Sequence, residues 1–185
     1  MKAQTDLREI LKKGVLNDEL DLERALILDR KLRLLVKANP ELAAERKQLR
    51  SIIKSYEKIN WSAHSAISKQ QIQESDDAEY FAEQERQFLE MRKEVIKRKL
   101  SKFNLSQQDL GKILGHSKSY MSELMNGICP FRNRDLIILH RLFHIKLEYL
   151  IPTIISQNDK GKLKESINKL NKPKLKLERE NLVFA

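Results

Sequence analysis

The stretch that decides the fold spans residues 105–127 and reads LSQQDLGKILGHSKSYMSELMNG. It predicts two short helices joined by a tight turn, the first over residues 107–114 and the second over residues 118–125. Ser106 stands at the N-cap position of the first helix, where its hydroxyl can accept a hydrogen bond from a free backbone N–H. Asp109, three residues on, can return a bond to the backbone N–H of Ser106, which makes a short-armed capping box.

Two glycines and the spacing of the apolar residues predict how these helices pack. Gly115 follows the last apolar residue of the first helix and can adopt the left-handed conformation that ends a helix. Gly111 has no side chain, so the second helix can approach the first closely. The apolar residues that share a face are Leu110 and Leu114 on the first helix and Met121 and Leu124 on the second.

This combination of cap, small residue, turn glycine and four apolar positions resembles the helix-turn-helix of the XRE family, the Cro-like phage-repressor type of DNA-binding domain. The resemblance covers about residues 94–152. It implies a five-helix domain in which the second helix of the motif reads base edges in the major groove. The alternative for the same pattern is a helical hairpin with no role in nucleic-acid binding.

Motif geometry and this resemblance together give the candidate DNA-contact residues. The N-terminal end of the second motif helix reaches base edges, where lysine donates to guanine and glutamate accepts from cytosine. We expect four outward-pointing base-contact residues, Lys118, Ser119, Ser122 and Glu123. We expect phosphate contacts from Gln107, Ser117, Tyr120, Asn126, Arg132 and Arg134, with His116 as a weaker candidate.

The composition predicts an all-α protein with a basic second half. The chain has 185 residues, of which 34% are charged, with only five glycines and four prolines. Together with the 3.6-residue periodicity of the apolar positions, this favours an all-α fold. Residues 1–85 carry a net charge of −1, residues 86–152 of +7 and residues 153–185 of +4. Positive charge on and after the motif would attract a phosphate backbone.

Several protein classes are excluded by the same composition. One cysteine cannot build an intramolecular disulfide framework and fits a reducing compartment. No apolar run approaches the ~20 residues that span a bilayer, and the first residues lack a signal-peptide core. We therefore expect a cytoplasmic, nucleoid-associated bacterial protein. No nucleophile triad, paired carboxylates or glycine-rich phosphate loop stands out, so we expect neither an enzyme nor a cofactor.

The first third of the chain predicts a helical hairpin. One apolar stripe runs over residues 17–38 with Asn17 as its N-cap, and a second runs over residues 40–59 and includes Leu49 and Tyr56. The two stripes can close on each other as an antiparallel pair. A hairpin of this size buries little apolar surface alone, so it needs a third element or a partner.

Residues 19–61, which end in IIKSYEKINW, are similar to the N-terminal region of HigA-type antitoxins. Those proteins combine such helices with a C-terminal XRE-type helix-turn-helix. The resemblance implies a homodimer that binds a small toxin through its N-terminal helices. Leu49 and Tyr56 lie on the apolar face of the hairpin, so we expect both to be needed for toxin binding, by direct contact or by keeping the hairpin folded. The resemblance also implies that the dimer represses its own operon on a palindromic operator. A longer connector and a basic tail set this chain apart from the usual family pattern.

The remaining segments complete the expected organisation. Residues 62–74 are polar and predict a linker, and a helix of ~40 Å should begin at Ser75. In that helix Tyr80, Phe81 and Phe88 are expected in the core. After the motif the residues expected to close the core are Ile128, Phe131, Leu136, Ile137, Leu139, Leu142, Phe143 and Ile145, before a last short helix over residues 147–151. The chain thus divides into an N-terminal helical region (1–61), a linker (62–74), a helix-turn-helix domain (75–152) and a basic tail (153–185).

Three functional alternatives stay open. The chain is an antitoxin, a stand-alone XRE-family repressor whose N-terminal helices dimerise or sense a ligand, or a helical scaffold whose motif is structural. Binding to one specific duplex would dismiss the scaffold, and a small toxin encoded next door would separate the first two. The lysine-rich tail is either solvated or a second phosphate-binding arm. His140 and His144 form an i, i+4 pair that can bind a metal, although we expect a structural role.

Overall fold

The computed structural model describes residues 6–62, 67–155 and 157–170. Every regular element in these ranges is helical, which confirms the predicted all-α class. The elements are α1 (Leu7–Lys13), α2 (Glu19–Leu35), α3 (Leu42–Asn60), α4 (Lys69–Lys102), α5 (Gln107–Leu114), α6 (Lys118–Asn126), α7 (Asn133–Phe143), the 3-10 turn η1 (Leu147–Tyr149) and α8 (Gln157–Leu170). None of the helices in these ranges combines the length and apolar character needed to cross a bilayer.

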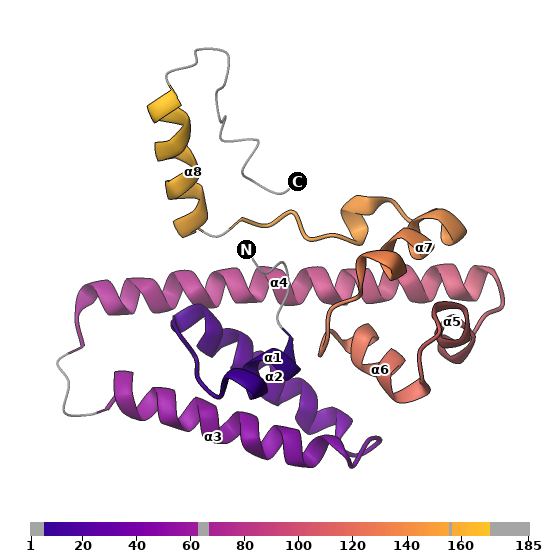
Figure 1. The fold of residues 1–185 in the computed structure, drawn as a ribbon, viewed down its shortest axis with the longest axis horizontal. Coiled ribbons are helices and arrows are strands. Elements are labelled where there is room, and N and C mark those ends of the chain that lie inside the picture. The colour runs from indigo at the N-terminus through magenta and orange to yellow at the C-terminus, as the bar shows by residue number, and fades with distance from the viewer. Residues whose placement is uncertain (1–5, 63–66, 156, 171–185) are drawn as a thin grey trace.

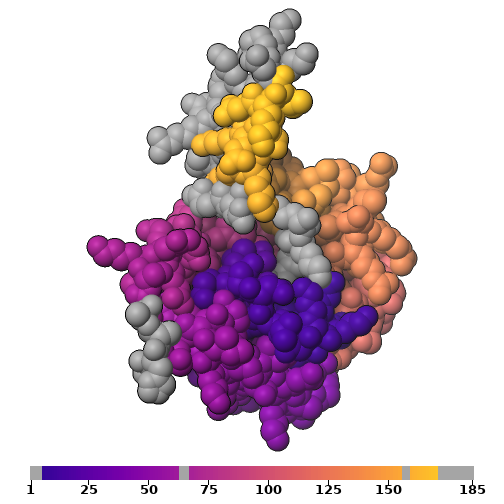
Figure 2. Space-filling model, turned by 60° about the vertical axis from the view of Figure 1, so that its left-hand side comes forward, coloured from indigo at the N-terminus to yellow at the C-terminus, as the bar shows by residue number. Residues whose placement is uncertain are grey.

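The long helix α4 organises the arrangement (Figure 1). Helices α1, α2 and α3 lie along its first part, and α5, α6 and α7 surround its second part. Buried side chains from both groups form one hydrophobic cluster, which extends from Leu7 in α1 to Leu150 beside η1. Helix α8 stands off from the bundle in both views (Figures 1 and 2). The N-terminal helices and the two-helix motif are therefore joined by packing as well as by the chain.

The N-terminal hairpin forms as its apolar stripes predict. Leu28 and Leu32 of α2 and Leu49 and Ile53 of α3 are all buried where the two helices pack together. Burial of apolar side chains of this size contributes about 1.5–3 kcal/mol each. The hairpin also has the third element that its small core needs, because α2 packs along α4.

The ends of α2 differ from the prediction. Its N-cap is Asp18, whose carboxylate accepts from the backbone N–H of Asp21 at 2.8 Å. Asn17, the expected cap, instead donates its side-chain amide to the Asp21 carboxylate at 2.7 Å. A carboxylate at the cap is favoured because it also interacts with the positive end of the helix dipole. The helix ends at Leu35, three residues earlier than expected.

Helix α4 begins at Lys69, six residues before the expected start at Ser75. The Ser68 hydroxyl caps it by accepting from the backbone N–H of Gln71 at 3.1 Å. The Gln71 side chain in turn donates to the Asn60 carbonyl at 2.9 Å and ties the start of α4 to the end of α3. Much of the expected linker is thus helical, because glutamine, glutamate and lysine have high helix propensity without any apolar periodicity.

The contact between α2 and α4 combines small residues with two ion pairs, Arg24–Glu85 and Lys31–Glu90. Ala78 and Ala82 of α4 are buried and let the two helices approach closely. Arg24 of α2 donates its Nε to the Glu85 carboxylate at 2.8 Å, and its guanidinium lies 5.9 Å from the Phe81 ring centroid. Tyr80 is 66% exposed, so the prediction that it packs in the core is wrong. It lies on the outer face of α4.

The helices after the motif close the core largely as expected. Five of the predicted residues are buried, namely Ile128, Phe131, Leu139, Phe143 and Ile145. Ile137 and Leu142 are exposed on the outer face of α7, contrary to the prediction. The expected last helix over residues 147–151 is the shorter 3-10 turn η1.

Candidate nucleic-acid interface

Helix α5 has the N-terminal cap that the sequence predicts. The Ser106 backbone N–H donates to the Asp109 carboxylate at 3.0 Å, and the Asp109 N–H donates to the Ser106 hydroxyl oxygen at 3.2 Å. The Ser106 hydroxyl also donates to the Asp109 carboxylate, at 2.7 Å. This bond and, second, the bond from the Ser106 backbone N–H lower the pKa of Asp109. The capping box therefore keeps a negative charge at the positive end of α5.

The turn between α5 and α6 is tight because of two glycines. Gly115 adopts φ +76°, the left-handed conformation predicted for the end of α5. Its N–H donates to the Lys112 carbonyl at 3.2 Å, and the His116 N–H donates to the Gly111 carbonyl at 2.8 Å. A Cβ added to Gly111 would lie 3.1 Å from the His116 carbonyl oxygen and 3.6 Å from the Met121 Cβ. The predicted close approach of the two helices is thus confirmed.

Helix α6 is also capped at both ends. The Ser117 hydroxyl accepts from the Tyr120 N–H at 3.2 Å. The helix ends at Asn126, one residue later than expected, and Gly127 follows with φ +68°. A Cβ added to Gly127 would lie 2.8 Å from Cδ1 of Leu89 in α4. The end of α6 is therefore pressed against α4.

The four expected base-contact residues separate into an accessible and a buried group. Lys118 is exposed at the start of α6, and Ser119 and Ser122 are half-buried. Glu123 is only 6% exposed, so the prediction that it points outward to read a base is wrong. Its side of α6 is covered by α1, a contact that the spacing of residues within α6 does not reveal.

Arg8 of α1 is the residue that covers Glu123. Its Nη2 donates to the Glu123 carboxylate at 2.7 Å, and its Nη1 donates to Sγ of Cys129 at 3.1 Å. The same guanidinium lies 5.2 Å from the centroid of the Tyr120 ring. One arginine from the start of the chain thus contacts α6 and the loop that follows it.

Burial controls the ionisation of this cluster. Burial raises the pKa of Glu123, and the positive charge of Arg8 acts against that rise. Burial also raises the pKa of the Cys129 thiol to about 12, although Arg8 favours the thiolate. The thiol is the less nucleophilic form, and Cys129 is buried beside α6, so we interpret it as a packing group.

The expected phosphate-contact residues lie in different surroundings. Arg132 and Arg134 are exposed at the start of α7, and Ser117 is exposed although its hydroxyl caps α6. Gln107 is half-buried at the start of α5. Tyr120 is half-buried, with its ring edge-on to His116 at 5.0 Å between centroids and Arg8 over it.

Asn126 does not belong to that exposed group. Its side-chain oxygen accepts from Nζ of Lys93 in α4 at 2.7 Å, and its carbonyl accepts from Nζ of Lys31 in α2 at 3.0 Å. Both lysines satisfy acceptors at the negative end of α6. Asn126 therefore connects α6 to the bundle, and its assignment as a phosphate contact stays a prediction.

His116 is also engaged inside the protein. Its Nε2 lies 3.0 Å from the Asp135 carboxylate, and both side chains are nearly buried. Asp135 also accepts from the backbone N–H of Arg132 at 3.3 Å. This carboxylate therefore joins the turn before α6 to the start of α7 and places Arg132 close to the motif. His116 is corrected from a phosphate contact to a positioning group.

The two residues expected to contact a toxin lie within the hairpin. Leu49 is 0% exposed, so it cannot contact a partner directly, and that part of the prediction is wrong. The half-buried Tyr56 donates its hydroxyl to the Glu19 carboxylate at 2.8 Å, and Nε1 of Trp61 donates to the same group at 3.1 Å. Burial and then the bond to Glu19 raise the pKa of Tyr56. Both residues stabilise the α2–α3 pair.

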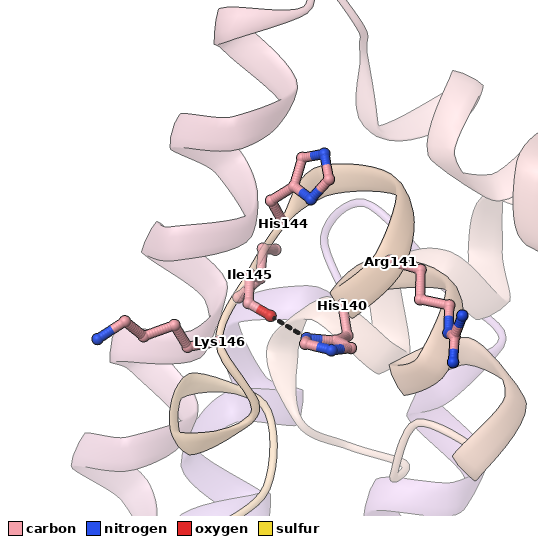
Figure 3. A pocket seen from close by; sticks show the side chains of 5 residues that line it. All are labelled: His140, Arg141, His144, Ile145 and Lys146. Carbon is pink, nitrogen blue, oxygen red and sulfur yellow. Dashed lines mark hydrogen bonds between the residues drawn. The ribbon is translucent and has the colours of Figure 1, made fainter.

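The two histidines after the motif do not form a helical pair (Figure 3). Helix α7 ends at Phe143, and His144 follows in a left-handed conformation with φ +51°. The ring of His140 turns toward the Ile145 carbonyl, with Nδ1 2.8 Å from that oxygen, while the ring of His144 points away from it. They line an open groove of about 430 Å³ together with Arg141, Ile145 and Lys146. The helical spacing that suggested a metal pair is therefore absent here.

Sequence reasoning missed three residues that shape this interface, Arg8, Glu41 and Asp135. Asp135 had a usable signal, because it stands three residues after Arg132, at the place of a capping-box acid. Arg8 and Glu41 had none, since they lie 115 and 78 residues from the α6 side chains that they contact.

No family model, curated protein or solved structure matches this chain. The resemblances to XRE repressors and HigA antitoxins thus rest on the residues and spacings quoted above.

Proposed function

We propose that this chain is a sequence-specific DNA-binding regulator, the antitoxin of a type II toxin–antitoxin pair that represses its own operon. The observation that supports DNA binding is the exposed start of α6. There Lys118 extends from a short, rigidly capped helix whose other faces are packed. Arg132 and Arg134 are exposed at the neighbouring start of α7. This is a small basic surface on a preorganised helix end, as base recognition requires.

The chemistry of that surface suits a duplex. Lys118 can donate to O6 or N7 of guanine in the major groove, and Ser119 and Ser122 follow it on α6. Arg132 and Arg134 can hold the backbone phosphates, which position a protein on DNA without reading its sequence. The site would bind as an XRE-type domain does, with two copies on the two halves of a palindrome.

The antitoxin part of the proposal rests on the resemblance of the N-terminal helices. Because Leu49 and Tyr56 are used within the hairpin, a toxin would instead meet the outer face of α3. Lys47, Arg50 and Lys54 are exposed there, along an open groove of about 360 Å³.

DNA binding is tested by selecting a preferred site from a randomised duplex library with the full chain. We expect Lys118→Ala to weaken binding to that site by about 1–3 kcal/mol and to relax the preference at one base pair. Lys58→Ala removes a similar exposed lysine at the far end of α3 and serves as the control. Equal effects of the two substitutions on affinity and preference would contradict the role of Lys118.

A stand-alone repressor is the second candidate, and a specific observation favours it. The N-terminal helices contact α6 through Arg8 and Glu41, so they have a function in shaping the DNA-binding unit even without a toxin. Co-expression of the full chain with its neighbouring gene, followed by a pull-down, separates the two. Co-purification of a small protein supports the antitoxin, and its absence together with specific operator binding supports the stand-alone repressor.

A further inference from the structure

The start of α3 lies against the start of α6. The hydroxyl of Ser119, a candidate base contact, donates to the carboxylate of Glu41 at 2.9 Å. Glu41 immediately precedes α3 and is exposed. A negative charge from the N-terminal half of the chain is thus held beside the exposed start of α6.

A second contact places more of the N-terminal half over the same helix. Arg8 lies over the Tyr120 ring and pairs with Glu123, one turn further along α6. Backbone atoms reinforce this contact, because the Leu7 N–H donates to the Ile128 carbonyl at 3.2 Å. The N-terminal helices therefore engage α6 at two adjoining residues, Ser119 and Tyr120, that DNA would need.

We infer that Glu41 competes with DNA for the start of α6 and thereby sets the affinity of the interface; this inference rests on the proposed DNA-binding function. A serine hydroxyl has one proton to donate, so Ser119 cannot donate to a base or a phosphate while it is bound to Glu41. The carboxylate also repels phosphates that approach α6 within a Debye length. DNA that binds at the start of α6 must therefore displace Glu41 from Ser119, or its phosphates must lie close to the negative charge of Glu41.

Substitution of Glu41 isolates this effect because the side chain does not cap α3. It makes no hydrogen bond to the backbone of α3, so its loss removes no helix cap. Glu41→Gln removes the charge and keeps an acceptor for Ser119, whereas Glu41→Ala removes both. Glu57→Gln makes the same change of charge at an exposed position of the same helix, 16 residues and ~24 Å away.

The experiment measures the dissociation constant of each full-length variant for one fluorescent duplex at several salt concentrations. The duplex is selected with the wild-type protein or, if that shows no binding, with Glu41→Ala. We expect Glu41→Gln to tighten binding about three- to tenfold at low salt, and Glu41→Ala by at least as much. A change of this size corresponds to the repulsion between two like charges that lie close together in water. We expect Glu57→Gln to change binding less than Glu41→Gln does. Circular dichroism checks that each variant remains helical.

The outcomes are distinct. Tighter binding by both Glu41 variants than by Glu57→Gln supports the inference, as does binding by Glu41→Ala when the wild type shows none. If the wild type binds a duplex and the Glu41 variants bind it with the same affinity, the inference is overturned and the proposed function is not. Weaker binding by Glu41→Gln also overturns it, because Glu41 would then be a reading residue. If neither the wild type nor Glu41→Ala binds any duplex, both the inference and the proposed function are overturned.

Discussion

A lysine, Lys31, lies inside the junction of α2, α4 and α6. Its Nζ donates to the Asn126 carbonyl at 3.0 Å and lies 3.9 Å from the Glu90 carboxylate. Burial lowers the pKa of Lys31 to about 8, although Glu90 favours the charged form. The buried charge is retained because it satisfies a carbonyl at the end of α6 that has no partner within its own helix.

Deprotonation of Lys31 should therefore stabilise the protein in mild alkali, while the raised pKa values of Cys129 and Tyr56 act in the opposite direction there. Between the folded pKa of about 8 and the ordinary value of 10.5, the unfolded chain binds the Lys31 proton more tightly than the folded chain does. We expect the free energy of unfolding to rise by about 2–3 kcal/mol across that window from this group. Urea denaturation of the wild type and of a variant without this lysine, at several pH values, separates this contribution from those of Cys129 and Tyr56.

Two lysine substitutions check the assignment. Between pH 8 and 10.5 the free energy of unfolding of the wild type should rise by about 2–3 kcal/mol relative to that of Lys31→Met. Lys37→Met replaces an exposed lysine just after α2 and should leave the pH dependence unchanged. A difference in free energy of unfolding between the wild type and Lys31→Met that does not change with pH would contradict the assignment.

At the scale of elements, the turn between α5 and α6 sets the direction of the candidate interface. Gly115 supplies a left-handed residue at the end of α5, and the carboxylate of Asp135 holds the following His116. Gly111 then lets α6 lie close to α5. A change in any of these would alter where Lys118 points.

Gly115→Ala should destabilise the protein by about 1–2 kcal/mol, since a Cβ is strained in the left-handed region even where space is open. Thermal unfolding followed by circular dichroism measures this loss. Gly161→Ala is the matched control, because Gly161 has open space and no positive φ within α8. It should leave the melting temperature of the bundle unchanged. A melting temperature of Gly115→Ala equal to the wild type would contradict the strain argument.

At the scale of the whole molecule, the two halves share their packing. Leu7 and Arg8 of α1 contact the loop and helix around residues 123–129, and α4 runs beneath both halves. In Figure 2 the indigo surface of α1 and the start of α2 lies between the magenta surface of α4 and the orange surface of the residues after α6. A division into an independent toxin-binding half and an independent DNA-binding half stays a prediction, and this shared packing argues for coupling between them.

The full chain should therefore unfold in one cooperative transition. Trp61 is the only tryptophan and lies beside Glu19 in the hairpin, so its fluorescence reports the N-terminal half. Circular dichroism at 222 nm reports all helices. We expect the two probes to give the same urea midpoint. A fluorescence midpoint clearly below the dichroism midpoint would show that the hairpin unfolds separately.

Local features were predictable from the sequence because their causes act within one turn of helix. Ser106 and Asp109 form their capping box three residues apart, and Gly115 ends α5. The apolar stripe that includes Leu49 identified the hairpin, although it did not distinguish a residue buried in the chain from one offered to a partner. Periodicity and capping thus determined the all-α class and the two-helix motif.

Only the tertiary structure decided which polar residues remain accessible. Glu123 looked exposed because its neighbours in sequence gave no reason for burial, yet Arg8, 115 residues away, covers it. Glu41 likewise meets Ser119 across 78 residues, and Lys31 meets Asn126 across 95. Such contacts arise because helices pack through whole faces, and the partner of a face depends on how every other face is buried. The spacing of residues within one helix carries no information about that choice.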